Sequence, residues 1–142
     1  MKTNQKVEWI DFVLTEGAKT YQLQNKMLKI FNKSVENRKI IFQNKCDKDL
    51  KEKIDELNFF LSQIANFKEQ LIHFYNHEFD KNEGQIADDE WYNQLEIYRI
   101  TIIIGKDGKC YADVVMGDSF FEDHLLDMEL GENKVFSMQY DG

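Results

Sequence analysis

The feature that most restricts the fold of this chain is an apolar stripe at helical spacing over residues 47–79. Its members recur three, four or seven positions apart, with a second row of phenylalanines beside them: Leu50, Ile54, Leu57, Leu61, Ile64, Leu71 and Tyr75, then Phe60, Phe67 and Phe74. A stripe of this width is typical of a helix packed on a sheet. The sequence therefore predicts one long amphipathic helix that covers a face of a β-sheet.

The length of this helix conflicts with the size of the protein. Asp49 and Glu52 have the spacing of a capping box, which marks the start of the helix. An unbroken helix over 47–79 is roughly 48 Å long. A compact chain of 142 residues is only about 37 Å across. We therefore expect the helix to be shorter at its ends, to bend near Asn66, or to project from the body.

Residues on both sides of the helix alternate as strands do. Strands are expected at 7–14, near 21–23, at 27–31 and at 39–43, and again at 96–104, 109–116, 124–130 and 134–140. Asp88 begins a short helix, and an acidic first turn suits the helix dipole. The prediction is an α+β fold in one domain, 1–142: an N-terminal antiparallel β meander, one long amphipathic helix plus a short helix, and a C-terminal four-strand antiparallel meander.

Charge divides the chain unequally and limits the classes of partner. Residues 1–46 contain nine basic and four acidic side chains, a net of +5, whereas residues 47–142 contain nine basic and 22 acidic ones, a net of −13. From Cys110 onward, Lys134 is the one basic residue against eight acids. Such a surface repels nucleic acid and anionic lipid and attracts a basic protein, although it equally serves solubility.

The chain begins without an apolar leader and contains no apolar run of membrane-spanning length. Its two cysteines do not make a disulfide framework. A cytoplasmic protein is expected.

Two patterns resemble metal sites in part. The segment from Asp80 to Glu90 resembles a calcium-binding loop, but it is one residue too short and has Gly84 at a ligand position. His73 and His77 are four residues apart, with Glu69 one turn earlier, a spacing that suits zinc. An acid-capped connector and a helix-surface pair explain them more simply. We expect no metal and no other cofactor.

Nucleophilic catalysis requires a Cys or Ser beside a His and an orienting acid. Cys46 precedes the helix, Cys110 lies in an expected strand, and Ser119 has no nucleophile-elbow context. No spacing brings these residues together, so we expect that the protein is not an enzyme.

A set of short motifs in the C-terminal half resembles a known type of domain. The motifs are Gly84-Gln85-Ile86, Asp89-Glu90-Trp91, Leu95-Glu96-Ile97, Asp107-Gly108 and Gly117-Asp118-Ser119-Phe120-Phe121-Glu122-Asp123-His124, followed by a hairpin. Over about residues 70–140 they resemble small bacterial domains of unknown function, some encoded beside polymorphic toxins as immunity proteins. The resemblance implies a strand, a Gly-Asp-x-Phe-x-x-His loop and another strand. It also implies stoichiometric neutralisation of a toxin domain.

Acids for steering and aromatic rings as anchors are what such an inhibitor requires. The expected partner-binding residues are Asp88, Asp89, Glu90, Trp91, Tyr92, Asp118, Phe120, Phe121, Glu122, Asp123 and His124. The two phenylalanines could instead close the end of the sheet, and His124 could cap its loop.

The main hypothesis is an immunity protein that binds a basic toxin domain. One alternative is a self-associating or scaffold domain, which an uncovered strand edge in the N-terminal meander favours. A calcium- or zinc-binding module is the second alternative.

Overall fold

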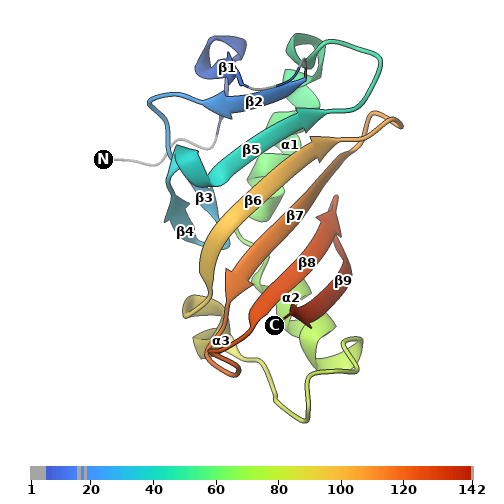
Figure 1. Cartoon of the computed structure of the whole chain (residues 1–142). Helices are drawn as coiled ribbons and strands as arrows, with labels where there is room; N and C mark the ends of the chain where they lie inside the picture. The colour runs from blue at the N-terminus through green and yellow to red at the C-terminus, as the bar shows by residue number, and fades with distance from the viewer. Residues whose placement is uncertain (1–5, 16, 18, 142) are drawn as a thin grey trace.

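The computed structural model describes residues 6–15, 17 and 19–141, and within them the chain forms a seven-stranded sheet with helices against one face (Figure 1). The strands are β1 (Phe12–Leu14), β2 (Thr20–Leu23), β5 (Ile40–Asn44), β6 (Glu96–Ile104), β7 (Cys110–Gly117), β8 (Leu125–Gly131) and β9 (Lys134–Asp141), in that spatial order. All neighbours are antiparallel except β5 and β6, which run parallel. Two further strands, β3 (Leu28–Ile30) and β4 (Lys33–Val35), form a separate antiparallel ribbon.

The predicted α+β class with a mostly antiparallel sheet is confirmed. The strands β6–β9 follow one another in antiparallel order, but they share one seven-stranded sheet with β1, β2 and β5 and do not form a sheet of their own. Ile40–Asn44 pairs in parallel with 100–104, so strands from both ends of the chain share one sheet. The β3–β4 ribbon leaves that sheet, and β4 occupies a polar stretch where no strand was expected. The central position of β6, by contrast, agrees with its long isoleucine run.

The N-terminal strand expected at 7–14 is shorter than its apolar pattern suggests. Trp9–Asp11 forms a 3₁₀ turn, η1, and β1 follows it. Glu8 and Asp11 form a capping box, in which each carboxylate accepts from the backbone N–H of the other residue. This local pairing competes with strand pairing, so only three residues join the sheet.

The long helix is broken in two near Asn66, which is one of the three outcomes that its length left open. A 3₁₀ turn, η3 (Leu50–Lys53), leads into α1 (Ile54–Ile64), and α2 (Lys68–His77) follows a short break. The capping box of Asp49 and Glu52 is present at the start of η3. The other helical elements are η2 (Asn37–Lys39) and the short α3 (Asp89–Asn93), which begins at Asp88 as predicted.

The break after α1 is stabilised by groups from distant parts of the chain. The turn between β3 and β4 donates two backbone hydrogen bonds, Phe31 N to the Ile64 carbonyl at 2.9 Å and Asn32 N to the Ala65 carbonyl at 2.7 Å. The N–H of Phe67 donates to the hydroxyl of Tyr92 at 3.0 Å. Backbone groups left without partners where a helix ends are satisfied here by tertiary contacts.

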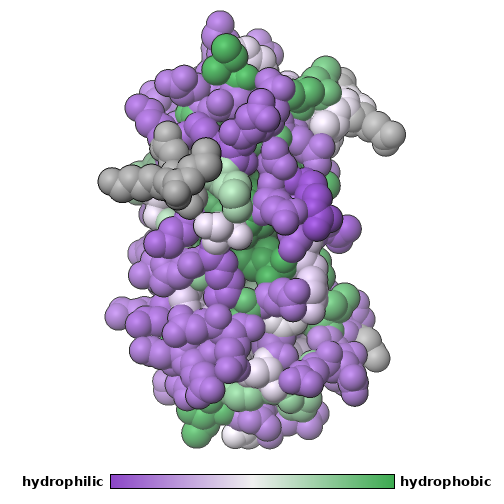
Figure 2. All heavy atoms as spheres, turned by 90° about the vertical axis from the view of Figure 1, so that its left-hand side faces the viewer, coloured by the Kyte–Doolittle hydropathy of each residue, from purple (hydrophilic) through white to green (hydrophobic). Residues whose placement is uncertain are grey.

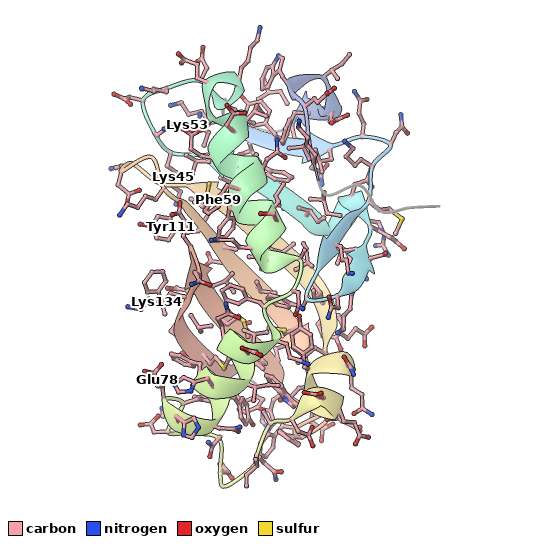
Figure 3. All side chains as sticks on the ribbon, turned by 180° about the vertical axis from the view of Figure 1, so that it is seen from behind. Lys45, Lys53, Phe59, Glu78, Tyr111 and Lys134 are labelled. Atoms are coloured by element: carbon pink, nitrogen blue, oxygen red, sulfur yellow. The ribbon has the colours of Figure 1, made fainter. Side chains whose placement is uncertain are left out.

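The two faces of the sheet differ in what covers them. Figure 3 shows α1 and α2 lying across the back of the sheet, where alternate residues of β6–β9 are buried against the helices. These inward residues include Ile100, Ile102, Ile104, Ala112, Val114, Met116, Leu126, Met128 and Leu130. The opposite face carries no helix in the part of the chain that the structure describes (Figure 1). Among the described helices, none is both long enough and apolar enough to span a bilayer.

Candidate functional site

A buried carboxylate, Asp118, joins the loop after β7 to two other parts of the fold, α3 and β9. Its Oδ2 atom accepts hydrogen bonds from Nε1 of Trp91 in α3, at 3.0 Å, and from the hydroxyl of Tyr140 in β9. Its Oδ1 atom accepts from the backbone N–H of Phe121 at 3.1 Å. Only 5% of Asp118 is exposed, so these donors replace the water that a buried carboxylate loses. We call Tyr75, Trp91, Asp118 and Tyr140 the Asp118 corner.

Two tyrosines extend this network toward α2. The hydroxyls of Tyr75 and Tyr140 lie 2.7 Å apart. Because Tyr140 donates its proton to Asp118, Tyr75 donates to the oxygen of Tyr140. Burial raises the pKa of Tyr75 to about 12, and burial followed by the hydrogen bond to Asp118 raises the pKa of Tyr140. Both hydroxyls therefore remain protonated donors at neutral pH.

The Asp118 corner fixes the loop that follows it. The ring of Phe120 lies 6.4 Å from Trp91 in a stacked arrangement, and the ring of Phe121 lies 4.8 Å from Tyr140 in an edge-on one. The N–H of His124 donates to the Phe121 carbonyl at 3.0 Å. Both phenylalanines are half-buried, so they serve packing and still present part of each ring. Their packing corresponds to the structural role that the sequence left open for them, and their role in binding a partner stays a prediction.

Beyond these rings, the loop presents exposed polar side chains. Glu122, Asp123 and His124 are all exposed. The imidazole of His124 lies edge-on to Phe121, with ring centroids 6.4 Å apart. We call residues 119–124 the acidic loop.

The first turn of α3 adds a second group of acids at the same corner, since Trp91 connects α3 to Asp118. Asp88, Asp89 and Glu90 are exposed. Asp88 caps the helix, accepting the Trp91 N–H at 2.9 Å, and Asp89 lies 3.5 Å from the ammonium of Lys68. The buried hydrogen bond between Trp91 and Asp118 thus holds α3 against the loop that follows β7.

Three predicted contact residues have too little accessible surface to meet a partner. Trp91 and Tyr92 are 1% and 0% exposed, and Asp118 is 5% exposed. Tyr92 holds the break between α1 and α2, and burial raises its pKa to about 12. The predicted partner-binding set is wrong at these positions, because Trp91 and Tyr92 pack from α3 into the core and Asp118 is enclosed by its three hydrogen-bond donors.

The two metal-site resemblances are explained by local structure. In the connector before α3, the Asn82 oxygen accepts the N–H of Gly84 at 2.9 Å, and its amide donates to the Tyr75 carbonyl at 2.9 Å. His73 and His77 lie on the exposed side of α2, with their rings tilted by 42° and the ring centroids 4.8 Å apart. Across residues 6–15, 17 and 19–141, no three His, Cys, Asp or Glu side chains are arranged to hold a metal ion.

The candidate nucleophiles do not come together. Cys46 is buried, with Sγ 3.0 Å from Oδ1 of Asn44. Cys110 is buried too, and burial raises the pKa of its thiol to about 12, which disfavours the thiolate form at neutral pH. Ser119 is exposed in the acidic loop.

A second exposed surface lies at the far end of the molecule. Large apolar side chains are exposed in η1, β1 and the turn before β3: Trp9, Ile10, Val13, Leu14 and Met27. Figure 2 shows hydrophobic surface at the upper end, the end that η1 and β1 occupy in Figure 1. β1 is also an edge strand of the sheet. This is the uncovered N-terminal edge on which the self-association alternative depends.

The sequence did not indicate the polar roles of two groups of residues. Tyr75 and Tyr140 were assigned to the apolar stripe and to a strand, without a polar role. Asp113, Asp127, Glu129 and Asp141 lie in strands with apolar neighbours. Their outward positions could have been predicted from strand alternation once the registers of β7–β9 were fixed.

The comparisons with known proteins return no relative. No family model matches the chain, and no curated protein or solved structure matches it either.

Proposed function

We propose that this chain is a non-enzymatic, cytoplasmic protein-binding domain, and that it is an immunity protein which neutralises a bacterial toxin domain by stoichiometric binding. The observation that carries the proposal is the acidic loop, whose backbone and rings are held by the Asp118 corner while Glu122, Asp123 and His124 stay exposed. A loop fixed before binding loses little conformational entropy when it meets a partner.

The charge of the surrounding surface supports a basic partner. Glu122 and Asp123 are exposed in the loop that the Trp91–Asp118 hydrogen bond joins to α3, and the start of that helix carries the exposed acids Asp88, Asp89 and Glu90. Acids grouped in this way accelerate the encounter with a positively charged surface, and salt weakens the effect. The exposed parts of Phe120 and Phe121 provide apolar contact area next to the charges.

The test begins with affinity capture from the native host at low and high salt, read by mass spectrometry. We expect one exported protein to be recovered at low salt and lost as salt rises. Its association rate is then measured for the double variant Glu122→Lys/Asp123→Lys. We expect that rate to fall at least about tenfold at low ionic strength.

A matched control separates this surface from net charge. Asp47 and Asp80 are exposed, so Asp47→Lys/Asp80→Lys makes the same change in net charge elsewhere. An equal loss of rate in both double variants would contradict a binding role for the acidic loop.

The exposed apolar end favours a second candidate, self-association. Val13 and Leu14 are 41% and 54% exposed on edge strand β1. Edge strands with apolar side chains pair readily with another chain. Light scattering over a range of concentrations tests this candidate: a dimer that Val13→Lys dissociates supports it, and a monomer at the highest concentration contradicts it.

A further inference from the structure

The open face of β6–β9 carries charged and polar side chains outside the acidic loop. The strand registers place them in two rows that cross the sheet, Arg99–Val115–Asp127–Gln139 and Thr101–Asp113–Glu129–Ser137. Except for Tyr98 and Phe136, which lie at irregularities of the strand register, their neighbours within the strands are buried or partly buried on the helix side. Because side chains alternate along a strand, these residues point away from the core. The two rows therefore form part of a sheet face that no described helix covers.

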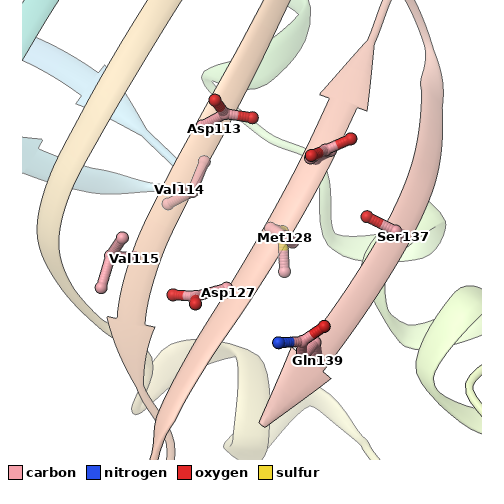
Figure 4. A pocket seen from close by; sticks show the side chains of 8 residues that line it. Asp113, Val114, Val115, Asp127, Met128, Ser137 and Gln139 are labelled. Atoms are coloured by element: carbon pink, nitrogen blue, oxygen red, sulfur yellow. The ribbon is translucent and has the colours of Figure 1, made fainter. Parts of the chain in front are cut away.

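The centre of this face is hollowed. An open hollow of about 290 Å³ is lined by Asp113, Val115, Asp127, Glu129, Ser137 and Gln139, together with the backbone of β7 and β8. Figure 4 shows Asp113 and Asp127 on neighbouring strands, with Ser137 and Gln139 on β9 at the other side. Val115 adds a small apolar surface beside Asp127, its partner in the strand register.

The negative charge of Asp127 is only partly offset by hydrogen bonds and by positive charges around it. Its Oδ1 atom is buried and has no hydrogen-bond partner among the described residues. Burial, followed by the negative charge of Asp141, raises the pKa of this carboxyl, and Asp113 adds to the effect. Arg99 alone opposes it, from two strands away. The carboxylate is thus held among like charges, which a cation from outside would relieve.

The spacing of the acids favours a large cation. Asp113 and Asp127 are diagonal neighbours on paired strands, as are Asp127 and Asp141, and such pairs are separated by about 7–8 Å. No three acids in the described part of the chain are arranged to hold a metal ion. A guanidinium group is planar, weakly hydrated and able to bind a carboxylate through two N–H groups, so it suits this spread of charge better than a compact ion.

We propose that the open face around Asp127 is a docking surface for an arginine side chain on a basic segment of the protein partner. The inference rests on the proposed binding function and names the chemistry of that partner. A second hollow, lined by Tyr98, Glu122, Asp123, His124, Leu125 and Asp141, joins the acidic loop to this face. The partner therefore contacts one continuous surface, with the loop at one end and Asp127 in the middle of the sheet.

The test uses the whole protein and a defined probe. The peptide acetyl-Gly-Arg-Gly-Arg-Gly-amide is titrated into ¹⁵N-labelled protein at low salt and followed by amide chemical shifts. A peptide with citrulline in place of arginine has the same shape without the charge. We expect the arginine peptide, but not the citrulline peptide, to shift the amide signals of residues 113–115, 127–129 and 137–139. We also expect Asp127→Asn to weaken binding of the arginine peptide about fivefold or more.

Two control variants make the result decisive. Asp80→Asn removes one exposed acid elsewhere and is expected to leave the affinity unchanged. We expect Glu122→Lys/Asp123→Lys to reduce the affinity for the arginine peptide less than Asp127→Asn does, since the acidic loop lies outside the hollow. Shifts spread over all acidic surfaces, equal binding of the citrulline peptide, or unchanged affinity in Asp127→Asn would each overturn the proposal. None of these outcomes requires the natural partner, so they leave the separate test of the acidic loop unaffected.

Discussion

Asp118 and Asp127 both belong to the acidic half of the chain, but their carboxylates have opposite surroundings. Asp118 lies in the Asp118 corner and accepts three hydrogen bonds, from an indole, a phenol and a backbone N–H. Asp127 lies on the open face with one buried oxygen unpartnered and like charges nearby. A carboxylate whose hydrogen bonds are complete stabilises a fold, whereas a buried oxygen without a hydrogen-bond partner requires an explanation, for which we proposed the docking of an arginine.

The largest expected effect comes from removing the satisfied carboxylate. Asp118→Ala leaves the Trp91 indole, the Tyr140 hydroxyl and the Phe121 N–H without acceptors. We expect the free energy of unfolding to fall by about 3 kcal/mol, because each buried donor that loses its partner costs about 1–3 kcal/mol. Urea denaturation measures this change. Asp127→Ala is the matched control, and a loss as large as that of Asp118→Ala would remove the distinction between the two sites.

A smaller loss of stability is expected when the hydroxyl of Tyr140, which donates to Asp118, is removed. Tyr140→Phe removes one donor to the carboxylate and the acceptor of the Tyr75 hydroxyl. We expect a loss of about 1–2 kcal/mol in the free energy of unfolding. Tyr111→Phe is the control, since that hydroxyl donates to Asp107 at an exposed position, and a change below about 0.5 kcal/mol is expected there. Equal losses would show that burial of the Asp118 corner contributes nothing to the strength of its hydrogen bonds.

The smallest expected effect is an increase in stability, in contrast to the losses expected at Asp118 and Tyr140. The folded protein holds the pKa of Asp127 above its value in the unfolded chain, so ionisation of this carboxyl destabilises the fold as pH rises through that raised pKa. In the variant Asp127→Asn, the amide side chain does not ionise, so this loss of stability is removed. We expect Asp127→Asn to raise Tm by about 1–2 °C at pH 7. The difference should disappear near pH 3, where the carboxyl of the wild type is protonated in both states. Calorimetry at the two pH values checks this, and a lower Tm for the variant at pH 7 would mean that the unpartnered oxygen has a stabilising contact.

Local patterns in the sequence determined the elements whose causes lie within a few residues. The capping box of Asp49 and Glu52 starts η3, Asp88 caps α3, and the isoleucine run of 96–104 forms a central strand. The length of the apolar stripe left three outcomes open, a shorter helix, a bend near Asn66 or a projecting helix, because an unbroken helix exceeds the diameter of a compact domain. The structure has the break near Asn66. The acidic character of the C-terminal half is likewise a property of composition.

Tertiary structure decided what depends on residues far apart in the chain. The parallel pairing of β5 with β6 joins two strands more than fifty residues apart, and no local periodicity specifies such a partner. Trp91 and Tyr92 were expected at the surface because acids precede them, but packing of α3 buries both rings. The contrast between Asp118 and Asp127 has the same origin: whether a carboxylate is satisfied depends on which donors the fold brings to it, and those donors come from other elements.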